Sequence, residues 1–409
     1  MNRFISRWLS ISILNLLLVA ALGLILRYKI AFSLPFLDQK YILHSHSHFA
    51  FSGWITQTLM ILMILYLSTT LGKAINNRYK WLLFSNLISS YGMMISFIMQ
   101  GYGLYSISFS TLNIFVFYSF ALYFWQDLNK LIEKSTSILW FKAALIFGVI
   151  SSFGAFNLAY MMANKMTNQD WYLSSIYFFL HFQYNGWFLF AGMGLLNDKL
   201  EIITGERQKL YRAFQLFCFA CIPAYFLSIL WMDFISNFYI LLIAAVIAQL
   251  VGWIIILKVY KKGGSLINQK ITYYGKTLLY LSALAFTIKL ILQSGSIHPE
   301  LSHLSYGFRP IIIGYLHLVL LGVTSIFLLG YIISFELISI NKLLITGIFI
   351  FVFGVIINEL LLMIQGVSAL SYTAIPFINE MLLGAAIILF SGILMMLISR
   401  LKFLQQHED

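Results

Sequence analysis

The sequence predicts an all-α membrane protein. Of its 409 residues, 61% are hydrophobic and only 10% are charged, whereas a typical soluble domain is about 25% charged. The apolar runs last about 18 residues or more, which is typical of membrane helices and not of the alternating strands of an outer-membrane barrel. The polar stretches between the runs are short, so we expect one polytopic membrane domain over residues 1–409.

Twelve apolar segments are predicted to form membrane helices. They cover residues 8–27, 44–71, 81–101, 105–126, 138–163, 171–196, 209–232, 237–260, 273–294, 309–334, 341–365 and 376–401. No small-residue cleavage site follows the first segment, so we expect it to be a retained helix and not a signal peptide. The tightest connection is at Gly101-Tyr-Gly103, between the third and fourth segments.

Basic residues gather at one end of the predicted bundle. With the N-terminus in the cytoplasm, 19 Lys and Arg residues fall at cytoplasmic helix ends and five at outer ends. The five outer residues are Arg27, Lys29, Lys40, Lys165 and Arg309. Because cytoplasmic loops carry an excess of Lys and Arg, both termini are predicted to be cytoplasmic. Anionic membrane lipid then explains the net charge of +12, and no soluble domain is available to bind nucleic acid.

One histidine motif recurs in every fourth predicted helix. In the second, sixth and tenth helices, a His is followed five residues later by a Gly. The three copies are His48 to Gly53, His181 to Gly186 and His317 to Gly322. The recurrence predicts three related four-helix units, at about 1–135, 136–270 and 271–409. A polar group inside a membrane needs a partner, so each imidazole either binds a ligand or bonds a neighbouring carbonyl.

The three motif histidines are predicted to lie in the outer half of the membrane. At 1.5 Å per residue, His48, His317 and His181 lie roughly 6, 12 and 15 Å below the outer helix ends. Each motif glycine follows about one and a half turns later. Since glycine has no side chain, it leaves a gap that a flat ligand or another helix could fill.

These features resemble subunit I of the haem–copper oxidase superfamily. The likeness is greatest to its C-type branch and to related membrane proteins of the nitric-oxide response. In that branch, a His-x-His pair followed by Gly-Trp binds haem, and this chain has His46-Ser-His48-Phe-Ala-Phe-Ser-Gly53-Trp54. The resemblance implies twelve helices in three four-helix arcs, a bacterial cytoplasmic membrane and further membrane subunits as partners.

The resemblance also implies a low-spin haem, of b type, held between His48 and His317. Two imidazoles on opposite faces of the iron make a six-coordinate haem suited to electron transfer. Because the register of His44-Ser-His46-Ser-His48 is open, His46 or His44 could replace His48. Arg309 either pairs with the haem propionates or anchors its helix at the interface.

The dioxygen-reducing centre of the family is incomplete here. Tyr315 stands where the family has the histidine that holds its high-spin haem, and the two adjacent histidines of helix 7 are missing. A normal proton-pumping oxidase is therefore disfavoured. An oxidase-like or nitric-oxide-related oxidoreductase stays open, with a separate protein or a quinol as electron donor.

A copper site is a further expectation. The resemblance matches His181 to a copper ligand. The only two cysteines, Cys218 and Cys221, lie one turn apart on the seventh predicted helix and at a similar depth. A His/Cys/Cys set would suit Cu(I), but both cysteines could equally be small apolar core residues.

The outer surface has its own polar cluster. It comprises His44, His46, His298, Glu300 and His303. These side chains could bind Cu(II) or Zn(II), or belong to solvated loops that bind nothing.

Charged residues inside the predicted helices include Glu359, Lys289 and Lys142. Glu359 could carry protons or pair with a lysine, and Lys289 is a functional candidate because a charge inside the membrane is costly. Lys142 is expected to extend toward the cytoplasmic face.

A different class of function is a carrier or sensor for haem, copper or another solute, without catalysis. Twelve helices are common among transporters, but many transporters contain two inverted halves. The threefold parallel repeat and the low proline count, five in all, argue against that arrangement.

Overall fold

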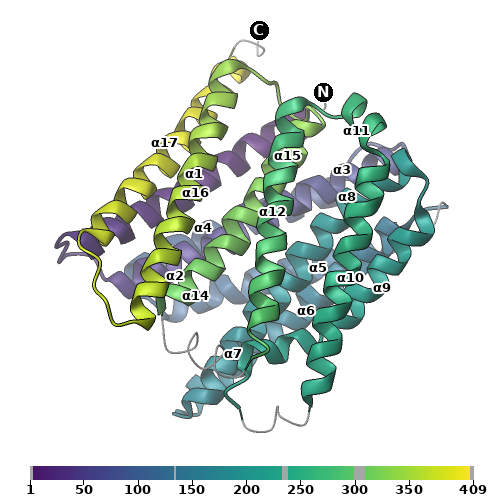
Figure 1. Ribbon diagram of the computed structural model, residues 1–409. Helices are drawn as coiled ribbons and strands as arrows, with labels where there is room; N and C mark the ends of the chain where they lie inside the picture. Colours follow the sequence, from purple (N-terminus) through teal and green to yellow (C-terminus); the bar gives the residue numbers. More distant parts are fainter. Residues whose placement is uncertain (1–2, 133–134, 233–237, 299–308, 406–409) are drawn as a thin grey trace. The chain divides into compact units, whose positions relative to one another are not determined.

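The protein is helical throughout the part described by the computed structural model, residues 3–132, 135–232, 238–298 and 309–405, which contains no strand (Figure 1). Within those residues, ten helices are long and apolar enough to cross a membrane, or eleven if one bent pair is a single span. The predicted class, an all-α membrane protein, is confirmed at this level.

Eight of the twelve predicted segments are uninterrupted α-helices. They are α1 (Arg3–Ala31), α4 (Asn77–Gln100), α5 (Leu104–Leu128), α6 (Thr136–Ala163), α10 (Tyr239–Lys262), α12 (Tyr273–Gly295), α16 (Lys342–Leu370) and α17 (Ile378–Gln405). All eight are among the ten apolar helices that are long enough to span a membrane. An additional short helix, α11 (Gly264–Lys270), was not expected.

Three predicted segments change from α-helix to π-helix and back without a break. The second segment consists of α2 (Gln39–Phe49), η1 (Ala50–Thr56) and α3 (Gln57–Leu71). The sixth consists of α7 (Gln169–His181), η2 (Phe182–Phe188) and α8 (Leu189–Thr204), and the tenth of α14 (Arg309–His317), η5 (Leu318–Ser325) and α15 (Ile326–Ser334).

The prediction of one continuous helix over 209–232 is wrong. The chain forms α9 (Arg207–Cys221) and a 3-10 helix, η3 (Pro223–Ile229), with a bend of 41° between them. Pro223 has no N–H, and its ring collides with the carbonyl one turn earlier, so it cannot continue an α-helix. The tighter turn of η3 also takes the N–H of Tyr225 to the carbonyl of Ile222, at 3.2 Å.

Short polar signals set the helix ends. Five side chains accept a backbone N–H at the start of a helix: Asp38, Asn76, Ser135, Asn168 and Asn341. These caps satisfy N–H groups that have no partner inside the helix. Between α4 and α5, Gly101 adopts a positive φ of 61°, which a residue with a side chain would adopt only with strain.

The helices group into two compact units. The first comprises Met1–Phe120, Thr272–Ser282 and Phe308–Asp409, and the second comprises Ala121–Ile271 and Ala283–Gly307. The second predicted repeat, about 136–270, therefore lies wholly in the second unit.

In the first unit, α17 packs along both α16 and α1 (Figure 1). Small residues bring α16 and α17 close together. A Cβ atom added to Gly347 would lie 2.7 Å from the carbonyl oxygen of Gly392, so the two backbones are nearly in contact, as in many membrane helix pairs.

Arg400 joins the two ends of the chain in the same unit. Its side chain is fully buried. The guanidinium donates to the hydroxyls of Ser6 at 2.7 Å and Ser10 at 3.3 Å, both on α1. It also donates to Ser339 at 2.9 Å. These bonds supply the polar partners that a buried charge requires.

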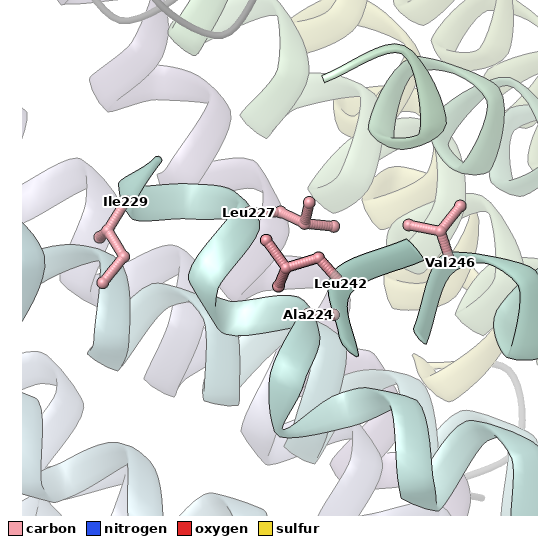
Figure 2. Close-up of a cluster of buried hydrophobic side chains, with 5 residues drawn as sticks. All are labelled: Ala224, Leu227, Ile229, Leu242 and Val246. Carbon is pink, nitrogen blue, oxygen red and sulfur yellow. The ribbon is translucent and has the colours of Figure 1, made fainter. Parts of the chain in front are cut away.

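In the second unit, α6 packs against α7 and α8, and α9 packs against α10. Figure 2 shows one part of its apolar core, where side chains of η3 and α10 meet. The buried members are Ala224, Leu227, Ile229, Leu242 and Val246. This packing holds the 3-10 segment in place after the bend at Pro223.

Candidate functional site

All three histidine motifs contain a π-helix. The motif glycines Gly53, Gly186 and Gly322 lie inside η1, η2 and η5. The histidine is the last α-helical residue in two copies, and in the first copy Phe49 alone separates His48 from the π-helix. Segments of π-helix are rare and frequently lie at functional sites. The three motifs therefore share a backbone form as well as a residue spacing.

In the first unit, side chains of other helices bond the carbonyls of two π-helices. Asn15 of α1 donates to the carbonyl of Gly53 at 2.6 Å. Ser282 of α12 donates to the carbonyl of Val323 in η5 at 2.8 Å. In the second unit, the thiol of Cys221 lies 3.7 Å from the carbonyl of Asn185 in η2. Each π-helix thus has an outside partner at, or next to, its motif glycine.

His46 of α2 packs against α1. Its Nδ1 lies 3.0 Å from the carbonyl oxygen of Val19. A Cβ added to Gly23 would lie 3.2 Å from the imidazole Cε1, so glycine makes room for this ring. Since a carbonyl can only accept, Nδ1 carries the proton and Nε2 carries the lone pair. Among the described residues, Nε2 has no hydrogen-bond partner.

His317 of α14 is in the same state. Its Nδ1 donates to the carbonyl of Ile313 at 2.8 Å, and its Nε2 has no partner among the described residues. His46 and His317 belong to the same unit, on α2 and α14. Metal-binding histidines typically donate one ring N–H to a carbonyl and bind the metal through the other nitrogen.

His48, the first-choice haem ligand from the sequence, has other contacts. Its ring stacks on Phe97 with centroids 4.5 Å apart, and its Nε2 lies 3.2 Å from the hydroxyl of Tyr102. His44 meets the edge of the same Tyr102 ring at 4.6 Å. The Nε2 of His44 is buried without a hydrogen-bond partner in the described part of the chain.

Arg27 is a site residue that the sequence reasoning missed. It lies within electrostatic range of His46, His317 and Glu359. Glu359 itself accepts a hydrogen bond from Asn358 at 3.1 Å. The cation within electrostatic range of Glu359 is thus an arginine, whereas the sequence left open a proton-carrying role or pairing with a lysine. The available signal was the position of Arg27, four residues after Gly23 on one face of α1.

Neighbouring side chains fill the space beside two of the motif glycines. The space beside Gly53 is filled by the ring of Phe49, and that beside Gly186 by Phe147 of α6. Helix packing therefore fills these two gaps.

Arg309 is the exposed first residue of α14, and its pairing with haem propionates stays a prediction.

His181 is satisfied by protein atoms on both sides of its ring. Nε2 lies 2.8 Å from the carbonyl of Cys221, and Nδ1 lies 3.1 Å from the amide nitrogen of Asn185. The carbonyl of Cys221 is free to accept because the bend before Pro223 interrupts the helix. This arrangement matches the simpler expectation, a buried histidine bonded to a neighbouring carbonyl.

The three residues of the expected copper set lie in one unit but do not form a ligand set. His181 meets the backbone oxygen of Cys221 and not its sulfur, while Cys218 is only half-buried. In the described ranges, no three His, Cys, Asp or Glu side chains are grouped to hold a metal ion. Copper binding here stays a prediction that the geometry does not support.

Lys289 of α12 is buried in the same unit. Its ammonium donates to the amide oxygen of Gln293 and lies 5.6 Å from the centroid of the Phe286 ring. Lys289 also lies within electrostatic range of His181 and Cys221.

The outer cluster is described only in part. His298 is exposed, whereas Glu300 and His303 lie outside the described residues. His44 and His46 belong to α2.

No protein-family model and no curated protein matches this chain. Its function must therefore be argued from its own residues.

Proposed function

We propose that the protein is a haem-binding integral membrane redox protein, in which His46 and His317 hold one low-spin haem. The observation that carries the proposal is the common state of these two imidazoles. Each donates Nδ1–H to a carbonyl and keeps Nε2 without a partner in the described chain. A pair of neutral imidazoles with lone pairs on Nε2 is the donor set that a bis-histidine haem requires.

The hydrogen bonds favour His46 over His48 as the ligand from α2. The carbonyl of Val19 fixes the ring orientation of His46 and increases the basicity of its Nε2. His48 uses its Nε2 toward Tyr102 and stacks on Phe97. This choice is one of the alternatives that the His44-Ser-His46-Ser-His48 register leaves open.

The electrostatic surroundings suit an anionic cofactor. Arg27 lies within electrostatic range of both histidines. Guanidinium groups bind carboxylates such as haem propionates by paired hydrogen bonds. When bound, a bis-histidine haem supplies reversible one-electron transfer. The chain's residues hold and orient it, and the electron donor is a separate protein or a quinol.

We also propose twelve membrane spans with both termini in the cytoplasm. Ten are helices of sufficient length and apolarity, and the bent pair of α9 and η3 is an eleventh. The helical stretch from α7 to α8 is the twelfth. It is less apolar because it contains His181, Gln183 and Asn185, which are engaged in hydrogen bonds within the protein. The excess of basic residues at one end supports the orientation.

A visible spectrum tests the proposed function. The full-length chain is expressed with a haem supply, purified in detergent and assayed for iron and haem. We expect one haem per chain and, after reduction with dithionite, a Soret band with split α and β bands. A colourless, iron-free protein would overturn the proposal and favour the alternative of a carrier or sensor without redox activity.

A further inference from the structure

The second unit contains an open cleft of about 750 Å³ at the basic end of its helices. The cleft lies where the end of α5 meets the starts of α6 and α9. Its polar lining includes Lys142, Arg207 and Tyr211. Its apolar lining includes Leu128, Leu131, Ile138 and Leu139. A cleft with cations on one part of its wall and leucine and isoleucine on another suits a ligand with an anionic head and an apolar body.

Lys142 has only neutral partners. Its ammonium donates to the amide oxygen of Asn129 at 2.7 Å and lies 4.9 Å from the centroid of the Trp125 ring. Among the described residues, no carboxylate forms an ion pair with it. The positive charge of Lys142 is therefore held in the cleft without being neutralised.

The carboxylates beside the cleft have other partners. Glu201 accepts hydrogen bonds from Ser135 and from the backbone N–H of Thr136, at 3.1 and 2.9 Å, and lies 3.6 Å from Arg207. Asp127 forms an ion pair with Lys130 at 2.7 Å. Arg207 is therefore paired with Glu201, and the charge that no described carboxylate neutralises is that of Lys142.

We propose that this cleft binds an anionic glycerophospholipid, with the lipid phosphate contacting Lys142 and Arg207 and the first part of an acyl chain against the leucine wall. Basic pockets between membrane helices on the cytoplasmic side bind anionic lipid head groups. The volume accommodates a head group, the glycerol and the first methylenes, and the remaining chain continues in the bilayer. Free phosphate shares the head-group chemistry but has no apolar part.

Lipid binding by the full chain tests this site. The protein is placed in phosphatidylcholine nanodiscs, and retained phosphatidylglycerol is measured by native mass spectrometry over a titration. We expect K142Q and R207Q each to lower the affinity for phosphatidylglycerol about 10-fold, through loss of a charge-assisted contact to phosphate. K209Q is the matched control, because Lys209 lies two residues from Arg207 but is not part of the cleft lining.

The outcomes separate the alternatives. Equal affinity in wild type, K142Q and R207Q would overturn the proposal, and so would an equal loss in K209Q, which would indicate surface charge alone. In a second experiment, inorganic phosphate at millimolar concentration is added as a competitor of the lipid. Competition by phosphate as effective as that by the lipid would overturn the lipid assignment and identify a small anion. Thermal unfolding of each variant shows whether the fold is intact, and K142Q is the decisive variant because Lys142 has no ion pair to lose.

Discussion

The indole nitrogen of Trp54 donates a hydrogen bond of 2.9 Å to the hydroxyl of Ser325, which is 271 residues away in the sequence. Both side chains are buried. Trp54 belongs to η1 and Ser325 to η5, so the bond joins the two π-helices that follow His48 and His317. The Gly-Trp pair of the first motif therefore connects the two histidine-bearing spans of the first unit.

Removing this bond should destabilise the protein. In Ser325→Ala the buried indole N–H of Trp54 loses its partner, at an expected cost of about 1–3 kcal/mol. Thermal unfolding in detergent measures the effect as a lower Tm. Ser96→Ala is the control, because the Ser96 hydroxyl bonds only carbonyls of its own helix, such as that of Gly92. Equal Tm values for the two variants would contradict the role of the Trp54 bond.

The haem ligands can be separated by substitution on one helix. His46→Ala and His317→Ala should each abolish the split low-spin bands and reduce bound haem, because each removes one axial imidazole. His48→Ala should retain the bands, since its contacts are to Phe97 and Tyr102. Reduced spectra and haem content measure the result. Loss of the bands in His48→Ala alone would restore His48 as the ligand.

His181 should behave as a structural residue. His181→Ala removes the partners of the Cys221 carbonyl and of the Asn185 amide, at about 1–3 kcal/mol for each buried group. We expect a lower Tm and an unchanged low-spin haem spectrum. Metal analysis of the variant gives the decisive comparison. A loss of bound copper with an unchanged Tm would show instead that His181 is a metal ligand.

The close contact of α16 and α17 predicts a position-dependent effect of alanine. In Gly392→Ala the new methyl would lie 2.5 Å from the backbone nitrogen of Phe351, so the helices must separate, at roughly 1–3 kcal/mol. Gly384→Ala on the same helix meets nothing within 4 Å and should be neutral or slightly stabilising. Comparison of the two Tm values tests the packing, and a tolerated Gly392→Ala would exclude it.

Acid stability should depend on Glu206, which lies between α8 and α9. Hydrogen bonds from Lys262 and then Lys209 hold the pKa of this carboxyl below its usual value of 4.5. A lowered pKa in the folded state means that the stabilisation is complete above the usual value and is lost as the pH falls through the folded value. We therefore measure Tm for wild type and Glu206→Gln from pH 7 to pH 3. The two Tm values should differ at pH 7 and converge at low pH. Curves that stay parallel would contradict this pairing.

Hydrophobic length predicted the helices well, because a helix that crosses a membrane must be long and apolar. The expected segment at 81–101 is α4 (Asn77–Gln100), for example, and Gly101 does turn the chain. The break at Pro223 was missed because 209–232 is apolar on both sides of the proline. Its cause is visible in the sequence, since an internal proline removes a backbone donor.

The backbone departs from α-helix at the histidine motifs, but the sequence analysis predicted uninterrupted helices there. A π-helix depends on which carbonyls find partners on other helices, such as that of Gly53 with Asn15, and one sequence does not show such pairings. For the same reason, the sequence alone does not decide whether His46 or His48 is the proposed haem ligand. The two residues differ by about 200° around a helix, and only the position of α1 determines which one meets Val19.

The bonds from Arg400 to Ser6 and Ser10 have a consequence for biogenesis. Residue 400 is translated long after Ser6 and Ser10, so α1 is inserted into the bilayer before Arg400 has been synthesised. Until translation is nearly complete, the N-terminal span has its contacts with α2 and η1 but lacks its hydrogen bonds to Arg400. Nascent chains truncated before α17 should therefore remain susceptible to membrane proteases that spare the finished protein.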